Sequence, residues 1–199
     1  MYSVVMRITL FLLCLLAAPT LTAQTLPEGP QRFWLELQIG ASTQQPNCGD
    51  CLQPSRIGGP TATAALGATI TQRVGVALLV REFDEFSLEE SHSGKYLVGL
   101  GQYLLNPGQA VGLTVNAGLG AGGQHGDAAP NGDNGTGVVV AGGLGMRLPA
   151  RTTFGLTINV DLMKSVTGNV RTTTGPGSSY RPLLSTVGLG LNIASSSQK

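Results

Sequence analysis

The stretch "VGLTVNAGLGAGG", from Val111 to Gly123, alternates apolar and small residues over its first eleven positions. The odd-numbered positions carry Val111, Leu113, Val115, Ala117, Leu119 and Ala121, and the even-numbered positions carry Gly112, Thr114, Asn116, Gly118 and Gly120. We call each such set of alternate positions a parity, because it corresponds to one face of a strand. A period of two is typical of a β-strand whose two faces meet different surroundings. The stretch therefore predicts a strand with one apolar face and one face of small side chains.

Seven more segments can be read as strands, most of them with the same alternation, so that the sequence predicts eight in all. They are Phe33–Ala41, Thr61–Thr71, Val74–Phe83, Lys95–Leu105, Val111–Ala121, Gly137–Arg147, Thr152–Met163 and Tyr180–Ile193. Each has about the length of a tilted membrane-crossing strand, roughly 9–11 residues. Short connections such as "NPGQ" (Asn106–Gln109) alternate with long ones, and short connections require antiparallel neighbours. We therefore expect an all-β, eight-stranded antiparallel up-and-down (meander) barrel with its long loops at one end.

Composition indicates which face of the strands points inward. Only 12% of the 199 residues are charged, against about a quarter in an ordinary soluble domain. The second face carries mostly Gly, Thr, Ala and Asn, which is too little charge for a water-facing surface but suits the narrow interior of an eight-stranded barrel. The apolar face then points into lipid, where the sheet must close because unpaired strand edges are costly in hydrocarbon. The sequence predicts a transmembrane β-barrel.

The N-terminal segment predicts a secretory signal peptide. Arg7 precedes an apolar run from Ile8 to Ala18, and Leu21, Thr22 and Ala23 form an imperfect Ala-x-Ala-like cleavage site. The run is too short to cross a bilayer as a helix. We expect residues 1–23 to be the signal peptide and residues 24–199 to be the barrel domain.

The charge balance excludes one class of partner. Removing Arg7 from the twelve basic residues leaves eleven, which equals the eleven acids, so the mature chain has no net formal charge. Nucleic-acid binding requires a basic face, and none is expected here.

Together these features resemble the small bacterial outer-membrane β-barrels of the OmpA/OmpX type. The resemblance covers the signal peptide, the alternating strands, the short turns and the longer loops. The last strand, "VGLGLNI", is also similar to the terminal insertion signal of that class, although it lacks a terminal aromatic residue. The resemblance implies export through the secretory pathway, location in the bacterial outer membrane, periplasmic short turns and extracellular long loops. The partners it implies are outer-membrane lipid, lipopolysaccharide and the barrel-assembly machinery.

Charged residues on the small-residue parity are candidates for the barrel interior. They are Glu36, Arg73, Arg81, Arg147 and Asp161. Buried charges require partners, so we expect a network in the lumen that includes Glu36 and one or more arginines. At eight strands such a network is expected to plug the pore.

Aromatic residues are expected at both membrane interfaces, as in membrane barrels generally. With a periplasmic N-terminus, the short-turn end would carry Phe33, Trp34, Tyr103 and Phe154. The long-loop end would carry Phe83, Phe86, Tyr96 and Tyr180.

Two loop segments could carry chemistry. "CGDC" places Cys48 and Cys51 in the first long loop, and an oxidising compartment favours a disulfide between them over a redox or metal site. The segment "EFDEFSLEESH" contains Glu82, Asp84, Glu85, Glu89 and Glu90. This acidic loop is interpreted as a solvated loop, and divalent-cation binding stays as an alternative.

These features predict a non-enzymatic protein without cofactor or metal, serving a structural or surface-interaction role. A first alternative is a barrel that binds or transports small hydrophobic molecules. A second is a lipid-A-modifying barrel enzyme using "SHSG" (Ser91–Gly94), but adjacent strand residues face opposite sides and pair poorly. A third is a soluble lipocalin-like calyx, whose Gly-x-Trp motif is absent before Trp34.

Overall fold

The structure is a computed structural model, and its strands account for most of the residues that it describes. Those residues are 33–45, 57–85, 92–107, 109, 111–126, 134–148, 154–167, 169–171 and 183–194. The strands are β1 (Phe33–Gln45), β2 (Ile57–Thr69), β3 (Val74–Asp84), β4 (His92–Leu104), β5 (Gly112–Gly126), β6 (Asn134–Leu148), β7 (Phe154–Ser165), β8 (Asn169–Arg171) and β9 (Leu183–Ala194). The predicted signal peptide, the Cys48–Cys51 disulfide, Phe86 and Tyr180 lie outside the described residues. Within those residues there is no helix that is long and apolar enough to cross a membrane.

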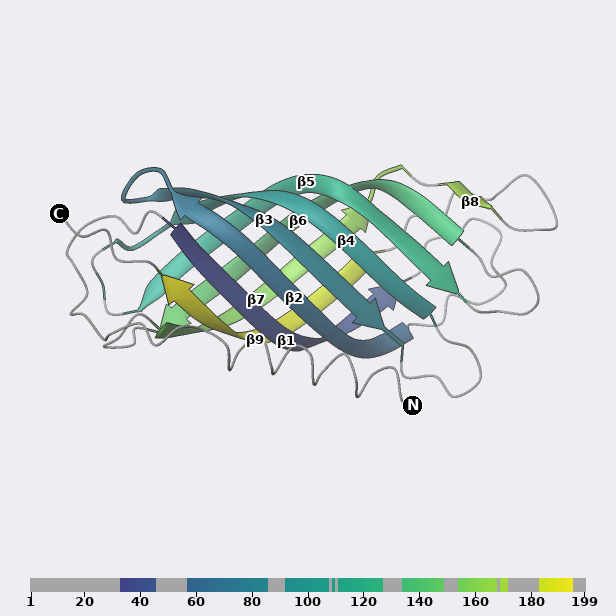
Figure 1. Cartoon of the computed structure of the whole chain (residues 1–199), viewed down its shortest axis with the longest axis horizontal. Coiled ribbons are helices and arrows are strands. Elements are labelled where there is room, and N and C mark those ends of the chain that lie inside the picture. The colour runs from purple at the N-terminus through teal and green to yellow at the C-terminus, as the bar shows by residue number, and fades with distance from the viewer. Residues whose placement is uncertain are drawn as a thin grey trace.

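Eight of the strands form one closed antiparallel barrel (Figure 1). Neighbours in the chain are neighbours in the sheet from β1 to β7, β9 then lies between β7 and β1, and the pairing of β5 with β6 closes the ring. Among the described residues, the short strand β8 pairs only with Asn134–Thr136 of β6, and it lies in the connection between β7 and β9. The predicted eight-stranded up-and-down barrel is confirmed.

The stagger of the strands follows from their register. Starting at Trp34, the in-register partners run through Gly67, Ala77, Leu100, Gly118, Ala141, Met163 and Leu184. The path returns to β1 at Gln44, ten residues beyond Trp34. With the usual strand rise and spacing, this stagger tilts the strands by roughly 40° from the barrel axis. That tilt is typical of membrane barrels.

The strands extend further toward the long-loop end than the sequence predicts. Strand β1 continues to Gln45, β5 continues to Gly126, and β6 already begins at Asn134. Antiparallel pairing provides hydrogen-bond partners for the backbone N–H and C=O groups there, although the side chains no longer alternate in polarity. The connections 85–91 and 127–133 consequently have the same length as 105–111 at the other end, and the predicted contrast in length is clearest for 46–56 and 166–182.

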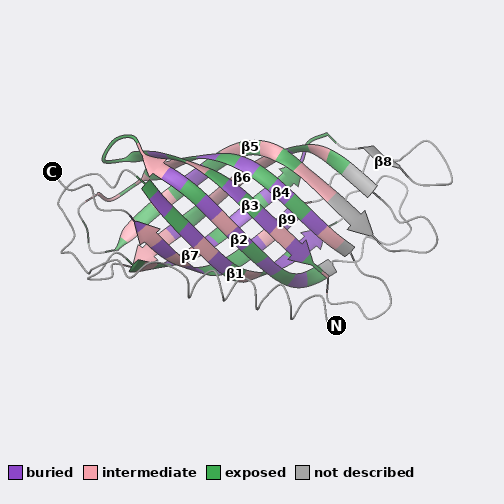
Figure 2. Cartoon of the chain, in the orientation of Figure 1, coloured by how far each residue is buried: buried purple, intermediate pink, exposed green. Residues whose placement is uncertain are grey.

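The two faces of the barrel have opposite chemistry. Buried and exposed residues alternate along the strands, as Figure 2 shows. The exposed parity carries large apolar side chains such as Leu78, which is 53% exposed. The buried parity carries most of the charged and amide side chains within the strands, and the side chain of Arg81 is 0% exposed. The lumen therefore contains the groups whose chemistry the remaining sections address.

Candidate functional site

The lumen is lined on one side by buried polar residues from β1, β2, β7 and β9, with Arg81 and Asn116 entering from β3 and β5. They are Glu36, Gln38, Ser42, Gln44, Thr61, Thr63, Arg81, Asn116, Thr157, Asn159, Asp161, Ser165, Thr186 and Asn192. Of the predicted interior charges, Glu36, Arg81 and Asp161 lie here. The sequence prediction missed the amide and hydroxyl side chains that bind them, although these occupy the same parity.

Arg81 reaches across the whole lumen. It lies on β3, and its Nη2 donates to Asp161 Oδ2 on β7 at 2.5 Å, four strands away around an eight-stranded ring. Its Nε donates to Thr63 Oγ1 at 2.9 Å and its Nη1 to Thr186 Oγ1 at 3.2 Å. Every nitrogen of the guanidinium thus has an acceptor, which is the condition for burying this charge. The pair Arg81–Asp161 connects opposite walls of the barrel.

A small hydroxyl cluster lies beside this pair. Ser42 Oγ hydrogen-bonds to Thr61 Oγ1 and, at 2.7 Å, to Thr186 Oγ1. Since Thr186 also accepts from Arg81, the hydroxyls of β1, β2 and β9 are joined to the same network.

Glu36 is the centre of a second network nearer the short-turn end. Its Oε1 accepts from Gln38 Nε2 at 2.5 Å, Thr157 Oγ1 at 2.8 Å and Asn159 Nδ2 at 2.7 Å. Its Oε2 accepts from Asn192 Nδ2 at 3.5 Å. The hydrogen bonds to this carboxylate therefore come from neutral donors. The sequence predicted a network that includes Glu36 and one or more arginines.

Arg147 lies at the short-turn end of the lumen. Its guanidinium carbon is 5.9 Å from the centre of the Trp34 ring, and it interacts electrostatically with Glu36. Its Nε is buried and has no hydrogen-bond partner among the described residues. The predicted interior position is correct, but the contact with Trp34 could not be read from the sequence.

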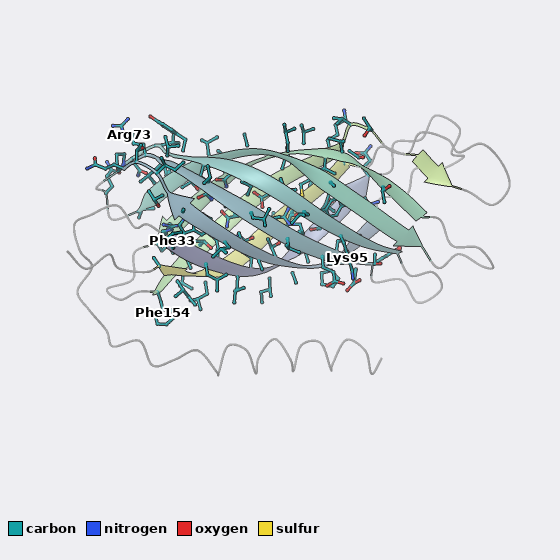
Figure 3. The ribbon with its side chains drawn as sticks, turned by 45° about the horizontal axis from the view of Figure 1, so that its top comes forward. Phe33, Arg73, Lys95 and Phe154 are labelled. Atoms are coloured by element: carbon teal, nitrogen blue, oxygen red, sulfur yellow. The ribbon has the colours of Figure 1, made fainter. Side chains whose placement is uncertain are left out.

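The prediction for Arg73 is wrong. Strand β3 begins only at Val74, so Arg73 lies in the β2–β3 turn, where its side chain is exposed. Its Nη1 donates to Tyr103 Oη at 3.3 Å. Parity places a residue inside the barrel only while the strand continues, and Figure 3 shows Arg73 at the end of the barrel that also carries Phe33 and Phe154.

Three of the predicted interface aromatics are also placed wrongly. Trp34, Phe83 and Tyr96 face the lumen and are buried, because they share the parity of Glu36, Arg81 and Val98. Space for the rings comes from glycines on the next strand. A Cβ at Gly67 would collide with the Trp34 ring, and one at Gly122 would lie 2.5 Å from Tyr96 Cδ1.

The remaining described aromatics lie outside the barrel, as predicted. Phe33, Tyr103 and Phe154 are exposed at the short-turn end, and Phe33 is 62% exposed. The described residues thus carry one ring of outward aromatics, at the short-turn end.

Apolar side chains fill the rest of the lumen. Phe83, Tyr96, Val139, Met163 and Leu184 are all buried and belong to one apolar cluster, which also includes Trp34 and Leu79. The interior therefore contains an apolar cluster beside the polar networks.

The described residues contain no group of three or more His, Cys, Asp or Glu side chains that could hold a metal ion. Of the acidic loop, residues 86–90 lie outside the described part. Glu82 lies on the outer face of β3, where Lys95 Nζ is 3.4 Å from its Oε1.

Comparison with solved structures gives close agreement in fold at low sequence identity. Neisserial surface protein A matches with a TM-score of 0.60 and 9% identity, covering 80% of this chain and 96% of that chain. The attachment invasion locus protein Ail of Yersinia pestis matches with a TM-score of 0.53 and 12% identity, covering 81% and 99%. OprG, an outer membrane protein of Pseudomonas aeruginosa, has a TM-score of 0.53 and 12% identity, covering 84% and 99%. The chain has the fold of the small bacterial outer-membrane barrels. No protein family model and no curated protein matches the sequence.

Proposed function

We propose that this chain is a non-enzymatic protein of the bacterial outer membrane, exported by the secretory pathway, with a closed lumen and a structural or surface-interaction role. The observation that carries the proposal is the Arg81–Asp161 pair, which spans the lumen of a barrel whose outer surface is apolar. The short turns would face the periplasm and the long loops the outside.

The outer surface supports the membrane location. On the described strands, outward charged residues occur only toward the long-loop end, and they are Glu82, Asp84, Lys95 and Lys164. Figure 3 shows Lys95 near that end and Phe33 and Phe154 near the other. The surface between these ends carries large exposed aliphatic side chains, which are stable in contact with lipid and costly in contact with water. Lipid and lipopolysaccharide are therefore the expected neighbours, and the barrel-assembly machinery is expected to insert the chain.

The interior supports a closed lumen. The Arg81–Asp161 pair crosses it, the Glu36 network lines the wall formed by β1, β9 and β7, and Trp34 with Arg147 occupies the short-turn end. An eight-stranded barrel is only wide enough for such side chains. Function is then expected to reside on the surface, and a fold neighbour named an attachment invasion locus protein, also crystallised with a heparin analogue, is consistent with such a role for this scaffold.

A second candidate function rests on the apolar cluster in the lumen. Phe83, Tyr96, Met163 and Leu184 would offer an apolar lining to a small hydrophobic molecule entering from the long-loop end. Retention of a fluorescent fatty acid by the refolded barrel tests this function, and Phe83→Asp should abolish the retention. A barrel that retains no fatty acid would exclude this candidate.

The membrane location can be tested by fractionating cells and running the outer-membrane material on a gel with and without boiling. A closed membrane barrel resists detergent until heated, so its mobility should change on boiling. Soluble periplasmic material without a mobility change would contradict the proposal and favour a lipocalin-like barrel.

The closed lumen can be tested by single-channel recording in a planar bilayer. The wild-type barrel should show no steady conductance, whereas Arg81→Ala should conduct because it removes the side chain that spans the lumen. Leu78→Ala, a truncation of the outer face on the same strand, is the matched control and should stay closed. A conducting wild-type barrel would contradict the proposal.

A further inference from the structure

The short-turn end of the lumen contains a guanidinium without a hydrogen bond. The Arg147 side chain on β6 is half-buried, and its Nε is buried without a partner among the described residues. Its guanidinium carbon lies over the Trp34 ring, 5.9 Å from the centre, and an indole has no acceptor atom for a guanidinium N–H. A buried donor without a partner is unfavourable, and such groups in native structures normally meet a water molecule or an ion.

The carboxylate of Glu36 does not supply the missing acceptor. Glu36 interacts electrostatically with Arg147, but its oxygens accept hydrogen bonds from neutral side chains of β1, β7 and β9. Among the described residues, no hydrogen bond joins Glu36 to Arg147. Glu36 therefore reduces the electrostatic cost of burying the guanidinium and leaves its N–H groups available.

Two more donors lie on the same wall of the lumen. Thr114 on β5 is a diagonal neighbour of Arg147, because Arg147 pairs with Gly112, two residues away. Gln102 on β4 is a diagonal neighbour of Thr114, because Gln102 pairs with Asn116. Such neighbours on one face are about 7–8 Å apart, within reach of long side chains. Within the described chain, the side chains of Gln102, Thr114 and Arg147 make no hydrogen bond, and we call them the mouth donors.

Glycines leave space beside Arg147 on both neighbouring strands. Gly112 is its in-register partner on β5, and a Cβ added to Gly155 on β7 would lie 3.8 Å from Arg147 Cγ. At both glycines an added Cβ would approach no atom closer than 3.4 Å, so packing does not exclude a side chain there. At Gly67, by contrast, the Trp34 ring already fills the space. The positions beside the guanidinium are therefore open to a ligand.

We propose that the mouth donors bind a small carboxylate anion at the short-turn end of the lumen. A guanidinium edge presents two parallel N–H groups, which match the two oxygens of a carboxylate. The Thr114 hydroxyl and the Gln102 amide supply neutral donors that complete the hydrogen bonds of the anion. Glu36 adds negative charge to this end, which favours a singly charged anion over a doubly charged phosphate.

The experiment is a fluorescence titration of the full barrel, refolded in nonionic detergent micelles at neutral pH. Sodium acetate replaces sodium chloride at constant ionic strength, and the fluorescence of Trp34, the only tryptophan, is recorded. Because Arg147 lies over this ring, acetate should change the fluorescence saturably, with half-saturation on the order of 10 mM. An acetate response equal to that of chloride would overturn the proposal. A saturable response to phosphate alone would overturn the choice of a carboxylate.

Variants locate the acetate within the barrel. Arg147→Gln should abolish the saturable response, whereas Arg73→Gln removes an exposed arginine at the same end and is the matched control, which should respond as the wild type does. Thr114→Val keeps Arg147 over Trp34 and removes one neutral donor, so its half-saturation concentration should rise roughly 2–10-fold. This variant separates a loss of binding from a loss of the fluorescence signal. A full response in Arg147→Gln would place the acetate elsewhere and would also overturn the proposal.

Discussion

The two faces of strand β3 show how differently the lumen and the outer surface are stabilised. On the outer face, the apolar side chains of Val76, Leu78 and Val80 are exposed and have no polar groups that need hydrogen-bond partners. On the inner face, Arg81 is fully buried and each of its donor nitrogens is bonded to a side chain of another strand. The outer face is stable when it contacts an apolar solvent, and it requires only that its residues be apolar. The inner face is stable only when its polar groups have particular hydrogen-bond partners. Substitutions on the two faces should therefore destabilise the barrel for different reasons.

The largest effect is expected from breaking the buried ion pair. Arg81→Met leaves the Asp161 carboxylate buried without its partner, which should lower the free energy of unfolding by about 3–5 kcal/mol. Urea unfolding in lipid vesicles, followed by the fluorescence of Trp34, the only tryptophan, measures this change.

The double variant Arg81→Met with Asp161→Leu is the control for that prediction. It removes both charges and should recover most of the loss, because an apolar pair carries no unpaired charge. A single variant as stable as the wild type would indicate that water enters the lumen and screens Asp161.

A charge introduced on the outer face should lower the free energy of unfolding slightly less than loss of the buried ion pair does. The size of this effect should depend on the depth of the residue in the membrane. Leu78→Arg, in the middle of β3, is expected to lower the free energy of unfolding by about 2–4 kcal/mol. Val74→Arg, at the short-turn end of the same strand, should cost about 0–1 kcal/mol because the guanidinium reaches the interface. Equal effects at both positions, in the same unfolding assay, would argue against a lipid-facing surface.

Replacement of glycine by alanine should also have different effects on stability on the two faces of the barrel. Gly67→Ala would place a methyl group against the Trp34 ring and should destabilise the barrel by about 1–3 kcal/mol. Gly101→Ala faces outward, where the nearest atom to the new Cβ is 3.7 Å away, and should be nearly neutral. The pair of variants is compared by the temperature of the gel-mobility change. If Gly101→Ala is the more harmful, the assignment of inner and outer faces is wrong.

The smallest effect is expected at the exposed ion pair between Lys95 and Glu82. Its nitrogen and oxygen are 3.4 Å apart, and the Lys95 side chain is largely exposed. Lys95→Ala should change the free energy of unfolding by at most about 1 kcal/mol, and less at high salt. Unfolding at low and at high salt measures both values. A larger effect that does not depend on salt would show that Lys95 acts through some other contact.

Errors in the sequence prediction arose where the position of a residue along its strand and its parity indicated different locations. Trp34, Phe83 and Tyr96 lie near strand ends, and their aromatic character suggested the membrane interface. Their parity is inward, and the structure follows parity, because a strand residue cannot turn to the other face without a change of register. Arg73 shows the opposite error, since the alternation of β3 was extended to Arg73, which lies one residue before the strand begins.

The sequence by itself determined the number of barrel strands, their antiparallel order and which face carries the apolar residues. These properties are local, because a period of two and a short turn are both read within a few residues. It also placed Glu36, Arg81 and Asp161 on the inner face, again by parity. Only the tertiary structure decided which of these side chains meet. Partners across the lumen depend on strand number and on the ten-residue stagger of the closed ring, which place β3 opposite β7 and let Arg81 reach Asp161. No local pattern contains that stagger, since it is a property of the closed barrel as a whole.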